Sequence, residues 1–409
     1  MIYVTVRQSP QYRQMTLDEF LFSTAPVSTL ITNNETNTRT YTVQLPNERL
    51  KSLTNPLYLT GVLQAFNKDT EPLREKDRSS LYNEFYIPKK SGGLRKIDAP
   101  VPELMDALRR LKRIFETDFG ALYHTTAFAY VKGRSTIDAV KRHQSNESRW
   151  FAKFDLSNFF GSTTPKFVMS MLCRIFPFSE VCALPEGREA LRTALDLAFL
   201  NGGLPQGTPI SPTLTNIMMI PIDHTISNVL HDYNKQRFVY TRYADDFIIS
   251  SRYGFSHQEI AERIMYIFDC FNAPFQLKPE KTRYGSRAGQ NWNLGLMLNK
   301  DNEITVGAKN KRRFKAMLTS YVLDHQHDTP WDISDIRVLD GLRSYYKMVE
   351  GKTIDDIVSR IGQKFGVNIP ALLRTDLTSA VVQSGTNPVN LPVDPEGFAL
   401  DPEDGDTPW

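Results

Sequence analysis

Two short runs in the middle of the chain have the mainly apolar composition of β-strands. The runs are Phe238–Arg242 and Phe247–Ser250, both rich in β-branched and aromatic residues, with Tyr243–Asp246 between them. Two such runs joined by a few turn-tolerant residues predict a β-hairpin. The hairpin tip would carry the adjacent carboxylates of Asp245 and Asp246.

Other segments show strand or helix periodicity. The run Phe151–Leu156 predicts a strand that ends on an acid, and Ile87–Ile97 predicts two short strands joined by a glycine turn. Strands mixed with helices, without a regular βαβ repeat, predict an α+β domain. Helical patterns occur after Pro100 (apolar Leu104, Leu108, Leu111 and Phe115), around Asp138–His143, near 165–200, from Pro209 to Ile222 and over 256–271.

Composition is that of an ordinary soluble globular protein, with 41% hydrophobic and 23% charged residues in 409. No apolar run is long enough to span a bilayer, and Met1–Val4 does not begin a signal peptide. The cysteines Cys173, Cys182 and Cys270 form no CxxC pair, which argues against a zinc site or a disulfide framework. We therefore expect a cytoplasmic protein with no membrane partner.

Charge is distributed unevenly along the chain. The stretch Ser384–Trp409 holds six acids, five prolines and no Lys or Arg, so the rest of the chain is more basic than the total of +3 suggests. A basic body with an acidic, Pro-rich end fits a polyanion binder with a disordered tail. A solvating tail without a role of its own is the alternative.

Three aspartates define the candidate chemistry. Asp155 ends one predicted strand, while Asp245 and Asp246 lie at the hairpin tip. If the strands are neighbours in one sheet, the carboxylates surround one pocket. Hard divalent cations prefer such oxygen ligands, and two cations about 4 Å apart clamp the attacking and leaving oxygens of an in-line displacement.

From about Tyr86 to about Gly307 the ordered segments resemble the reverse transcriptases, in which an aspartate on one palm strand and a Y-x-D-D hairpin form the catalytic site. The resemblance implies a right-hand polymerase fold with fingers, a palm built on an antiparallel sheet and a short helical thumb. The implied ranges are an N-terminal extension of unknown role at 1–70, fingers at 71–154, palm at 155–300 with a fingers insertion at about 165–205, thumb at 301–375 and a disordered acidic tail at 376–409.

The resemblance also assigns roles at the metal site. Asp155 and Asp245 would bind two Mg²⁺ ions, for which Mn²⁺ can substitute, with the Leu156 carbonyl as an extra ligand and Asp246 in support. Phe160 matches the aromatic residue that lies beneath the sugar. Its ring would collide with a ribose 2′-OH, which implies dNTP substrates.

Further residues match segments that contact the incoming nucleotide. Arg95 and Lys96, with Lys89 or Lys90, resemble the fingers hairpin that grips the triphosphate. Gln206 would lie near the sugar, and Gly207 would let the backbone approach the substrate. Lys281, with Lys278 as the close alternative, would approach the leaving pyrophosphate. The turn Asn293–Leu296 resembles the one that supports the primer strand.

Basic residues outside the palm suggest contact with nucleic acid. The stretch Ala308–Lys315 contains five of them and predicts a helix along a template–primer duplex that touches phosphates without reading sequence. Ordinary solvated helix faces are the alternative. The candidate nucleic-acid-binding residues are Arg109, Arg113, Arg134, Lys309, Lys311, Arg312, Arg313 and Lys315.

The segments Phe128–Ser135 and Thr241–Asp246 resemble those of bacterial retron and group II intron enzymes. Asp138-Ala139 with His143, and Leu294–Met297, depart from the retron pattern. The resemblance implies a stand-alone, retron-like or defence-associated enzyme. Such an enzyme copies a dedicated noncoding RNA template into a DNA product, in many cases to protect against phage.

Three alternatives stay open. An RNA-dependent RNA polymerase shares the paired acids, but Ala244 and Phe160 stand where Gly and a second acid are usual. Template-independent or protein-primed DNA synthesis would use the same metal site. A catalytically silent RNA-binding scaffold is disfavoured by the intact aspartates. The template, the primer, the fate of the DNA, the role of residues 1–70 and any homo-oligomer are not determined by the sequence.

Overall fold

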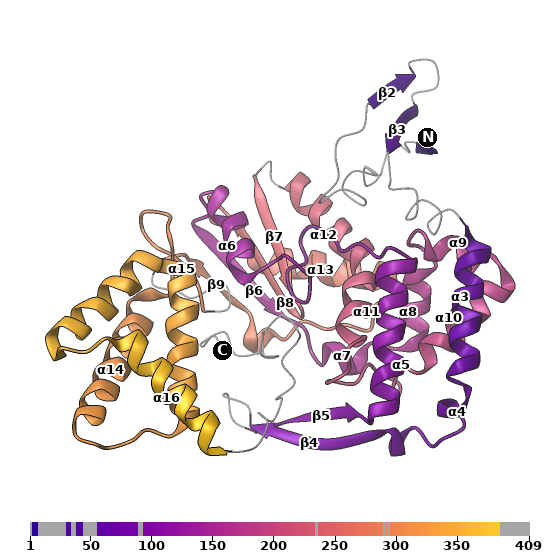
Figure 1. The fold of residues 1–409 in the computed structure, drawn as a ribbon. Helices are drawn as coiled ribbons and strands as arrows, with labels where there is room; N and C mark the ends of the chain where they lie inside the picture. Colours follow the sequence, from indigo (N-terminus) through magenta and orange to yellow (C-terminus); the bar gives the residue numbers. More distant parts are fainter. Residues whose placement is uncertain are drawn as a thin grey trace. The chain divides into compact units, whose positions relative to one another are not determined.

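The structure is a computed structural model, shown in Figure 1. It describes residues 2–6, 30–33, 38–43, 55–88, 93–233, 236–288, 292 and 295–384. No helix among the described residues is both long and apolar enough to cross a membrane.

The chain forms two compact units. The first contains Met1–Arg134, Lys153–Ile249 and Phe255–Arg283, and the second contains Ser135–Ala152, Ser250–Gly254 and Tyr284–Trp409. Both units are therefore assembled from segments distant in sequence. These boundaries do not coincide with the fingers, palm and thumb ranges, which stay a prediction.

Strands and helices alternate irregularly, as expected for an α+β fold. The strands are β1 (Ile2–Val6), β2 (Leu30–Asn33), β3 (Thr38–Val43), β4 (Tyr82–Pro88), β5 (Leu94–Pro100), β6 (Trp150–Asp155), β7 (Phe238–Tyr243), β8 (Asp246–Ser251), β9 (Arg283–Ser286), β10 (Met297–Leu298) and β11 (Ile304–Thr305). The helices of the first unit are α3 (Pro56–Asp69), α4 (Glu71–Arg74), α5 (Pro102–Arg113), α7 (Phe159–Ser162), α8 (Pro165–Leu172), α9 (Phe178–Ala183), α10 (Pro185–Asp196), α11 (Ser211–Met218), α12 (Ile220–Asp232) and α13 (His257–Phe271). Those of the second unit are α6 (Thr136–Ser145), α14 (Gly307–Gln326), α15 (Ile333–Phe365) and α16 (Ile369–Ser384). Single turns of other helix types are η1 (Ser79–Leu81), η2 (Ile114–Asp118) and η4 (Pro279–Lys281).

A four-stranded sheet carries the predicted hairpin. Its strand order is β7-β8-β6-β9, so the hairpin β7–β8 lies directly beside β6. Every residue of β8, and every residue of β6 after Trp150, is buried, including the polar residues Lys153, Ser250 and Ser251. The predicted neighbour relation between the Asp155 strand and the Asp245 hairpin is confirmed.

The hairpin predicted over Ile87–Ile97 is longer than its sequence signal suggested. β4 and β5 pair antiparallel from Tyr82 opposite Pro100 to Pro88 opposite Leu94. Phe85, Tyr86 and Ile87 are exposed on it. The four residues 89–92 at the tip lie outside the described residues.

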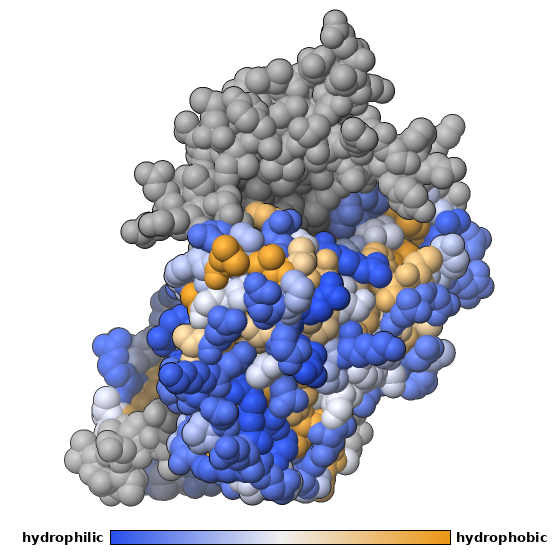
Figure 2. Space-filling model, turned by 90° about the vertical axis from the view of Figure 1, so that its right-hand side faces the viewer, coloured by the Kyte–Doolittle hydropathy of each residue, from blue (hydrophilic) through white to orange (hydrophobic). Residues whose placement is uncertain are grey.

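Helices of the first unit bury one face each. The predicted apolar positions of α5, Leu104, Leu108 and Leu111, are fully buried, and so is Phe115 in the following turn. Phe115 and Phe119 pack against Phe178 of α9 at ring-centroid distances of 5.1 and 4.4 Å. Figure 2 shows the outer face of the α3 and α10 region as mainly hydrophilic, with small hydrophobic groups.

Helix α3 belongs to this packing although it falls within the predicted N-terminal extension. Leu59, Leu63 and Phe66 are buried, and the Asn67 side-chain amide donates a hydrogen bond to the Ala190 carbonyl of α10 (2.8 Å). The predicted boundary at residue 70 therefore separates α3 from the helices it packs on.

Proline residues divide two of the stretches that were predicted to be helical. The stretch near 165–200 is three helices, α8, α9 and α10, with Pro177 immediately before α9 and Pro185 at the start of α10. The helix expected from Pro209 to Ile222 divides at Met219, and Pro221 lies in the first turn of α12. Proline lacks the N–H that a continuing helix needs but fits its first turn.

The second unit contains the helices predicted as a thumb. Phe314 of α14 packs edge-on against Tyr346 of α15, with centroids 5.6 Å apart. α15 is interrupted at Glu350, whose φ and ψ are −133° and 56°. α16 continues to Ser384, so the first part of the tail, expected to be disordered from residue 376, is helical instead. The rest of the tail, 385–409, lies outside the described residues.

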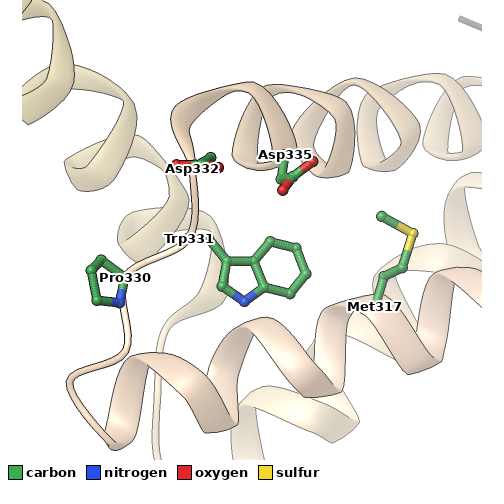
Figure 3. Close-up of a pocket in the computed structure, with 5 residues that line it drawn as sticks. All are labelled: Met317, Pro330, Trp331, Asp332 and Asp335. Atoms are coloured by element: carbon green, nitrogen blue, oxygen red, sulfur yellow. The ribbon is translucent and has the colours of Figure 1, made fainter.

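A surface hollow of about 470 Å³ lies where α14 faces the start of α15 (Figure 3). The Trp331 indole donates a hydrogen bond to Asp324 (2.9 Å) and packs edge-on against Tyr321. Trp331 therefore anchors the turn between the two helices. The two acids on its rim make the hollow unsuitable for phosphate groups. The lining residues are Met317, Pro330, Trp331, Asp332 and Asp335.

Candidate catalytic site

Adjacent strands bring the three predicted aspartates together. Asp155 is the last residue of β6, and the Leu156 N–H donates to the Asp245 carbonyl across the strand pair (3.2 Å). Asp246 is the first residue of β8. All three aspartate side chains are buried. The structure thus gathers Asp155, Leu156, Asp245 and Asp246 at one end of the sheet.

The hairpin turn depends on a left-handed residue. Ala244 has a φ of +53° and is buried, a conformation that costs a residue with a Cβ atom about 1–2 kcal/mol. The Arg242 guanidinium donates to the Ala244 carbonyl (3.2 Å). Arg242 therefore supports the residue that sets the direction of the aspartate pair.

Arg242 is itself fixed by a fully buried carboxylate on α12. Its Nε and Nη2 donate to Oδ1 and Oδ2 of Asp223, each at 2.9 Å, and the Tyr240 hydroxyl donates to Asp223 Oδ1 (2.8 Å). Burial alone would lower the pKa of Arg242, but the Asp223 carboxylate outweighs burial and raises that pKa. A two-point buried pair of this kind fixes geometry more firmly than a single charge contact.

We did not identify Asp223 or Arg242 as site residues from the sequence. A signal for both was present. Asp223 follows Ile220 and precedes Ile226 at helical spacing on a buried face, and Arg242 stands inside an otherwise uncharged strand. A buried acid and a buried base so placed indicate a partner.

Three lysines occupy the acid cluster. Lys278 and Lys281 lie 3.0 and 3.4 Å from the two carboxylate oxygens of Asp155. Lys153 lies 2.7 Å from Asp246. Burial raises the pKa of Asp246 to about 6, although Lys153 acts in the opposite direction. The ammonium groups thus compensate much of the buried negative charge.

The donor set fits hard divalent cations, because carboxylate oxygens are the ligands that such ions prefer. Within the described part of the chain, however, no three acidic, His or Cys side chains gather closely enough to enclose an ion. Lysine ammonium groups lie at ion-pair distance from Asp155 and Asp246, and the pocket of three carboxylates stays a prediction. The metal-ligand roles of Asp155, Leu156, Asp245 and Asp246 stay predictions.

Lys281 was predicted to lie near the leaving pyrophosphate, with Lys278 as the alternative. Lys278 is nearer to Asp155 than Lys281 is, and its backbone N–H also donates to the Asp155 carbonyl (2.9 Å). The structure places both lysines at the site.

Phe160 lies in α7, five residues after Asp155. Its ring is half-buried and meets the buried ring of Phe159 edge-on, with centroids 5.7 Å apart. The Leu204 N–H donates to the Phe160 carbonyl (3.0 Å). Phe159, rather than Phe160, is the core phenylalanine, so the Phe160 ring keeps the partial exposure that a sugar gate needs.

Gly207 serves the protein's own packing. Its φ is +108°, and a Cβ atom there would lie 2.9 Å from Ile97 Cγ2 and 3.2 Å from the Asp98 carbonyl. The Gln206 carbonyl accepts a hydrogen bond from the Asp98 N–H (2.9 Å). The Gly207 backbone thus lies close to β5, and the hydrogen bond couples Gln206 to the β4–β5 hairpin. The approach of the Gly207 backbone to substrate stays a prediction.

The basic residues of that hairpin differ in their surroundings. Lys96 is exposed and paired with Glu84 (2.6 Å) and Asp98 (3.3 Å), and Arg95 on the same strand is half-buried. Lys89 and Lys90 lie outside the described residues. The triphosphate-binding roles of all four stay predictions.

Candidate contacts to nucleic acid divide into exposed and structural residues. Arg109 and Arg113 are exposed on α5. The Arg134 guanidinium donates to the carbonyls of His124 (2.5 Å) and Ala127 (2.7 Å), so it holds a loop of its own unit. Four of the five candidate residues on α14 are exposed, namely Lys309, Arg312, Arg313 and Lys315.

Lys311 is the exception on α14. Its ammonium lies 2.8 Å from Glu350 and 3.2 Å from the Thr305 hydroxyl. The Glu350 carboxylate also accepts from the Val306 N–H (2.9 Å) just before α14 begins. Lys311 therefore stabilises the start of its own helix.

The departures from the retron pattern have local explanations. Asp138 and Ser135 form a capping box at the start of α6, which accounts for an acid at that position. His143 is fully buried and shares a 2.6 Å hydrogen bond with Ser250. Asn293 and Leu294 of the predicted primer-support turn lie outside the described residues.

Comparison with known proteins agrees with this geometry. A family model described as reverse transcriptase (RNA-dependent DNA polymerase) matches residues 87–313. The retron Ec83 reverse transcriptase of Escherichia coli is 27% identical over 313 residues, covering 74% of this chain and 93% of that protein. The retron Mx65 reverse transcriptase of Myxococcus xanthus is 27% identical over 300 residues, covering 70% and 66%. A solved apo telomerase from Candida tropicalis is 11% identical with a TM-score of 0.41, covering 88% of this chain and 74% of its own.

The family match includes β5, the Asp155 strand and the β7–β8 hairpin, and it extends over more than half of the chain. The α+β architecture has the antiparallel sheet expected of a right-hand polymerase. The chain belongs to the reverse transcriptase family, the RNA-directed DNA polymerases.

Proposed function

We propose that this reverse transcriptase makes cDNA from a dedicated noncoding RNA by Mg²⁺-dependent, two-metal nucleotidyl transfer. The observation that carries the chemical part is the meeting of Asp155, Asp245 and Asp246 on adjacent strands. Bound Mg²⁺ ions would supply charge stabilisation for the attacking and leaving oxygens. Asp155 and Asp245 would hold them, with Asp246 in support.

The protein's own residues would position the substrates. Phe160 would exclude a ribose 2′-OH, and Gln206 would lie near the sugar. Lys278 and Lys281 would release Asp155 and turn to the phosphates when a nucleotide arrives. Such catalysis rests on positioning and charge neutralisation and needs no covalent protein intermediate.

Similarity to retron reverse transcriptases supports the dedicated noncoding RNA. A role in defence against phage is part of the same proposal. It rests on the resemblance of the sequence alone.

The test is to sequence the nucleic acids that copurify with the protein from its native host, beside an Asp245→Ala/Asp246→Ala variant. One dominant RNA in both samples, with complementary DNA only in the wild type, is the expected result. In parallel, purified protein should extend a primer on an RNA template with dNTPs, and the variant should lose at least about 10³-fold in rate because the metal ligands are gone.

Three outcomes would contradict the proposal in whole or in part. DNA without any matching RNA would favour untemplated synthesis. RNA without DNA, together with no primer extension by the wild type, would favour the silent scaffold. Phage protection that survives in the double variant would separate defence from polymerisation.

A further inference from the structure

The ends of β6, β8 and β9 that do not carry the aspartates form a surface within the second unit. The Arg149 N–H donates to the Ser251 carbonyl (2.9 Å), and the Arg287 N–H donates to the Arg149 carbonyl (2.7 Å). Arg149 directly precedes β6, Arg252 directly follows β8 and Arg287 directly follows β9. Three neighbouring strands therefore each present an arginine at the same end of the sheet.

Aromatic side chains accompany these arginines. Trp150 and Tyr284 stack with ring centroids 5.6 Å apart and planes inclined by 21°. The Gly254 backbone lies against both rings, since a Cβ there would be 3.5 Å from the Tyr284 hydroxyl and 3.8 Å from Trp150. The preceding residue, Tyr253, is 68% exposed. The strand ends thus combine a packed aromatic base with one projecting ring.

Two of the arginines are held in place and one extends from the surface. The Arg252 guanidinium donates to the Asn146 carbonyl (2.8 Å) and lies 3.3 Å from the exposed Glu147. Arg287 donates to the Asn302 side chain (2.8 Å) and to the Lys300 carbonyl (3.0 Å). Arg149 is exposed. Both of these Arg287 acceptors are neutral, and Glu147 offsets the charge of Arg252 alone, so the three arginines leave a net positive charge on this surface.

We propose that this strand-end surface, made of Arg149, Trp150, Arg252, Tyr253, Tyr284 and Arg287, binds a single-stranded part of the enzyme's RNA. The inference rests on the proposed function for the source of the RNA. An exposed ring stacks on any base, and flanking arginines contact the phosphates on either side of it. Aromatic side chains interleaved with basic ones are the combination that single-stranded nucleic acids recognise, whereas an acidic peptide would not use the projecting ring.

A matched control exists on the same protein. Tyr266 on α13 is 70% exposed, nearly the same as Tyr253, but its neighbours are Glu259, Glu262 and Arg263. Tyr266→Ala therefore measures the effect of losing an exposed tyrosine, and Tyr253→Ala measures the effect of losing an exposed tyrosine that lies among arginines.

The experiment measures two quantities on the full chain. The first is the Kd of a short unstructured oligoribonucleotide as a function of salt. The second is the KM and kcat for primer extension on a template with a long single-stranded overhang and on one with a minimal overhang. The variants are Tyr253→Ala, Tyr253→Phe, Arg149→Ala and Tyr266→Ala, each checked for an unchanged melting temperature.

Tyr253→Ala should weaken binding by roughly tenfold, as expected for loss of one base–aromatic stack. Tyr253→Phe should restore it, and Arg149→Ala should reduce the salt slope by about one. The KM for the long overhang should rise, while kcat and the KM for the minimal template should not change.

Equal effects of Tyr253→Ala and Tyr266→Ala would overturn the proposal, as would an unchanged Kd in Tyr253→Ala and Arg149→Ala. The proposal would also fail if the variants lost binding only to the oligodeoxyribonucleotide of the same sequence and kept binding to the oligoribonucleotide, because the ligand would then be DNA. If the wild type extends no primer, the proposed function fails, but the binding titration still decides this inference.

Discussion

At the scale of single residues, the catalytic hairpin is supported by an ion pair that takes no part in the chemistry. Arg242 links the Ala244 carbonyl to Asp223 on α12, and both charged side chains are fully buried. Removing one partner of such a pair leaves an uncompensated buried charge. Asp223 and Arg242 are thus positioning residues.

Asp223→Asn should lower the free energy of unfolding by about 3–5 kcal/mol, because Arg242 would keep its charge without a carboxylate partner. It should also lower kcat for primer extension more than it changes the KM for dNTP, since the aspartate pair would lose its fixed direction. Urea unfolding and steady-state kinetics measure the two effects.

Tyr240→Phe is the matched control, because it removes only one hydrogen bond to Asp223 and should cost about 1 kcal/mol. A kcat of Asp223→Asn equal to the wild type, at a temperature where both are folded, would show that the pair stabilises the fold without orienting the site.

At the scale of elements, α14 combines two tasks on different faces. Its exposed basic residues suit contact with a duplex backbone, while Lys311 and Glu350 tie its first turn to the interruption in α15. The Glu350 carboxylate accepts the Val306 N–H, which satisfies one of the donors left open at a helix start.

Substitutions on the two faces of α14 should therefore have different effects. Arg312→Ala with Arg313→Ala should weaken binding to an RNA–DNA duplex and reduce its salt slope by about two, because two phosphate contacts are lost. Lys311→Met should leave that slope unchanged and lower stability by about 1–3 kcal/mol, because it leaves Glu350 without its cationic partner.

Salt-dependent binding titrations and thermal unfolding separate these outcomes. A Lys311→Met variant with wild-type stability and a reduced slope would assign Lys311 to nucleic acid after all. A slope that Arg312→Ala and Arg313→Ala leave untouched would remove α14 from the duplex-binding surface.

At the scale of the whole molecule, buried histidines link stability to pH in both units. Burial is the main cause that lowers the pKa of His143 to about 3 and that of His124 to about 4. Both are neutral in the folded protein at pH 7, whereas in the unfolded chain they take up protons below about 6.5. Their contribution to stability is therefore complete above that pH and is lost as the pH falls through it toward 4 and 3.

Lowering the pH from 7.5 to 5 should cost about 2 kcal/mol of unfolding free energy for each of these two histidines. The urea midpoint, measured at a series of pH values, tests this. His143→Gln should be less stable at pH 7.5, since the buried hydrogen bond between His143 and Ser250 is lost, and should show a flatter pH dependence. His327→Gln is the control, because His327 is exposed, and a flattening there equal to that in His143→Gln would disprove the assignment.

Much of the fold followed from local pattern. The sequence predicted the strand that ends on Asp155, the hairpin with Asp245 and Asp246, and the apolar face of α5. The spacing of apolar residues and the residue types within a few positions are sufficient to predict each of these elements. The division of the helix predicted from Pro209 to Ile222 was missed, although Pro221 lacks the N–H that a continuing helix needs.

The sequence by itself determined the family, the aspartates at the end of the sheet and the residue types available for chemistry, since each can be recognised from short local motifs. Only the tertiary structure decided which groups meet. It paired Asp223 with Arg242, set Lys153, Lys278 and Lys281 against the aspartates, and turned Gly207 toward β5. It also gathered the arginines of three strand ends. The physical reason is that these contacts depend on strand order and on burial between distant segments, and the periodicity of a single segment contains neither.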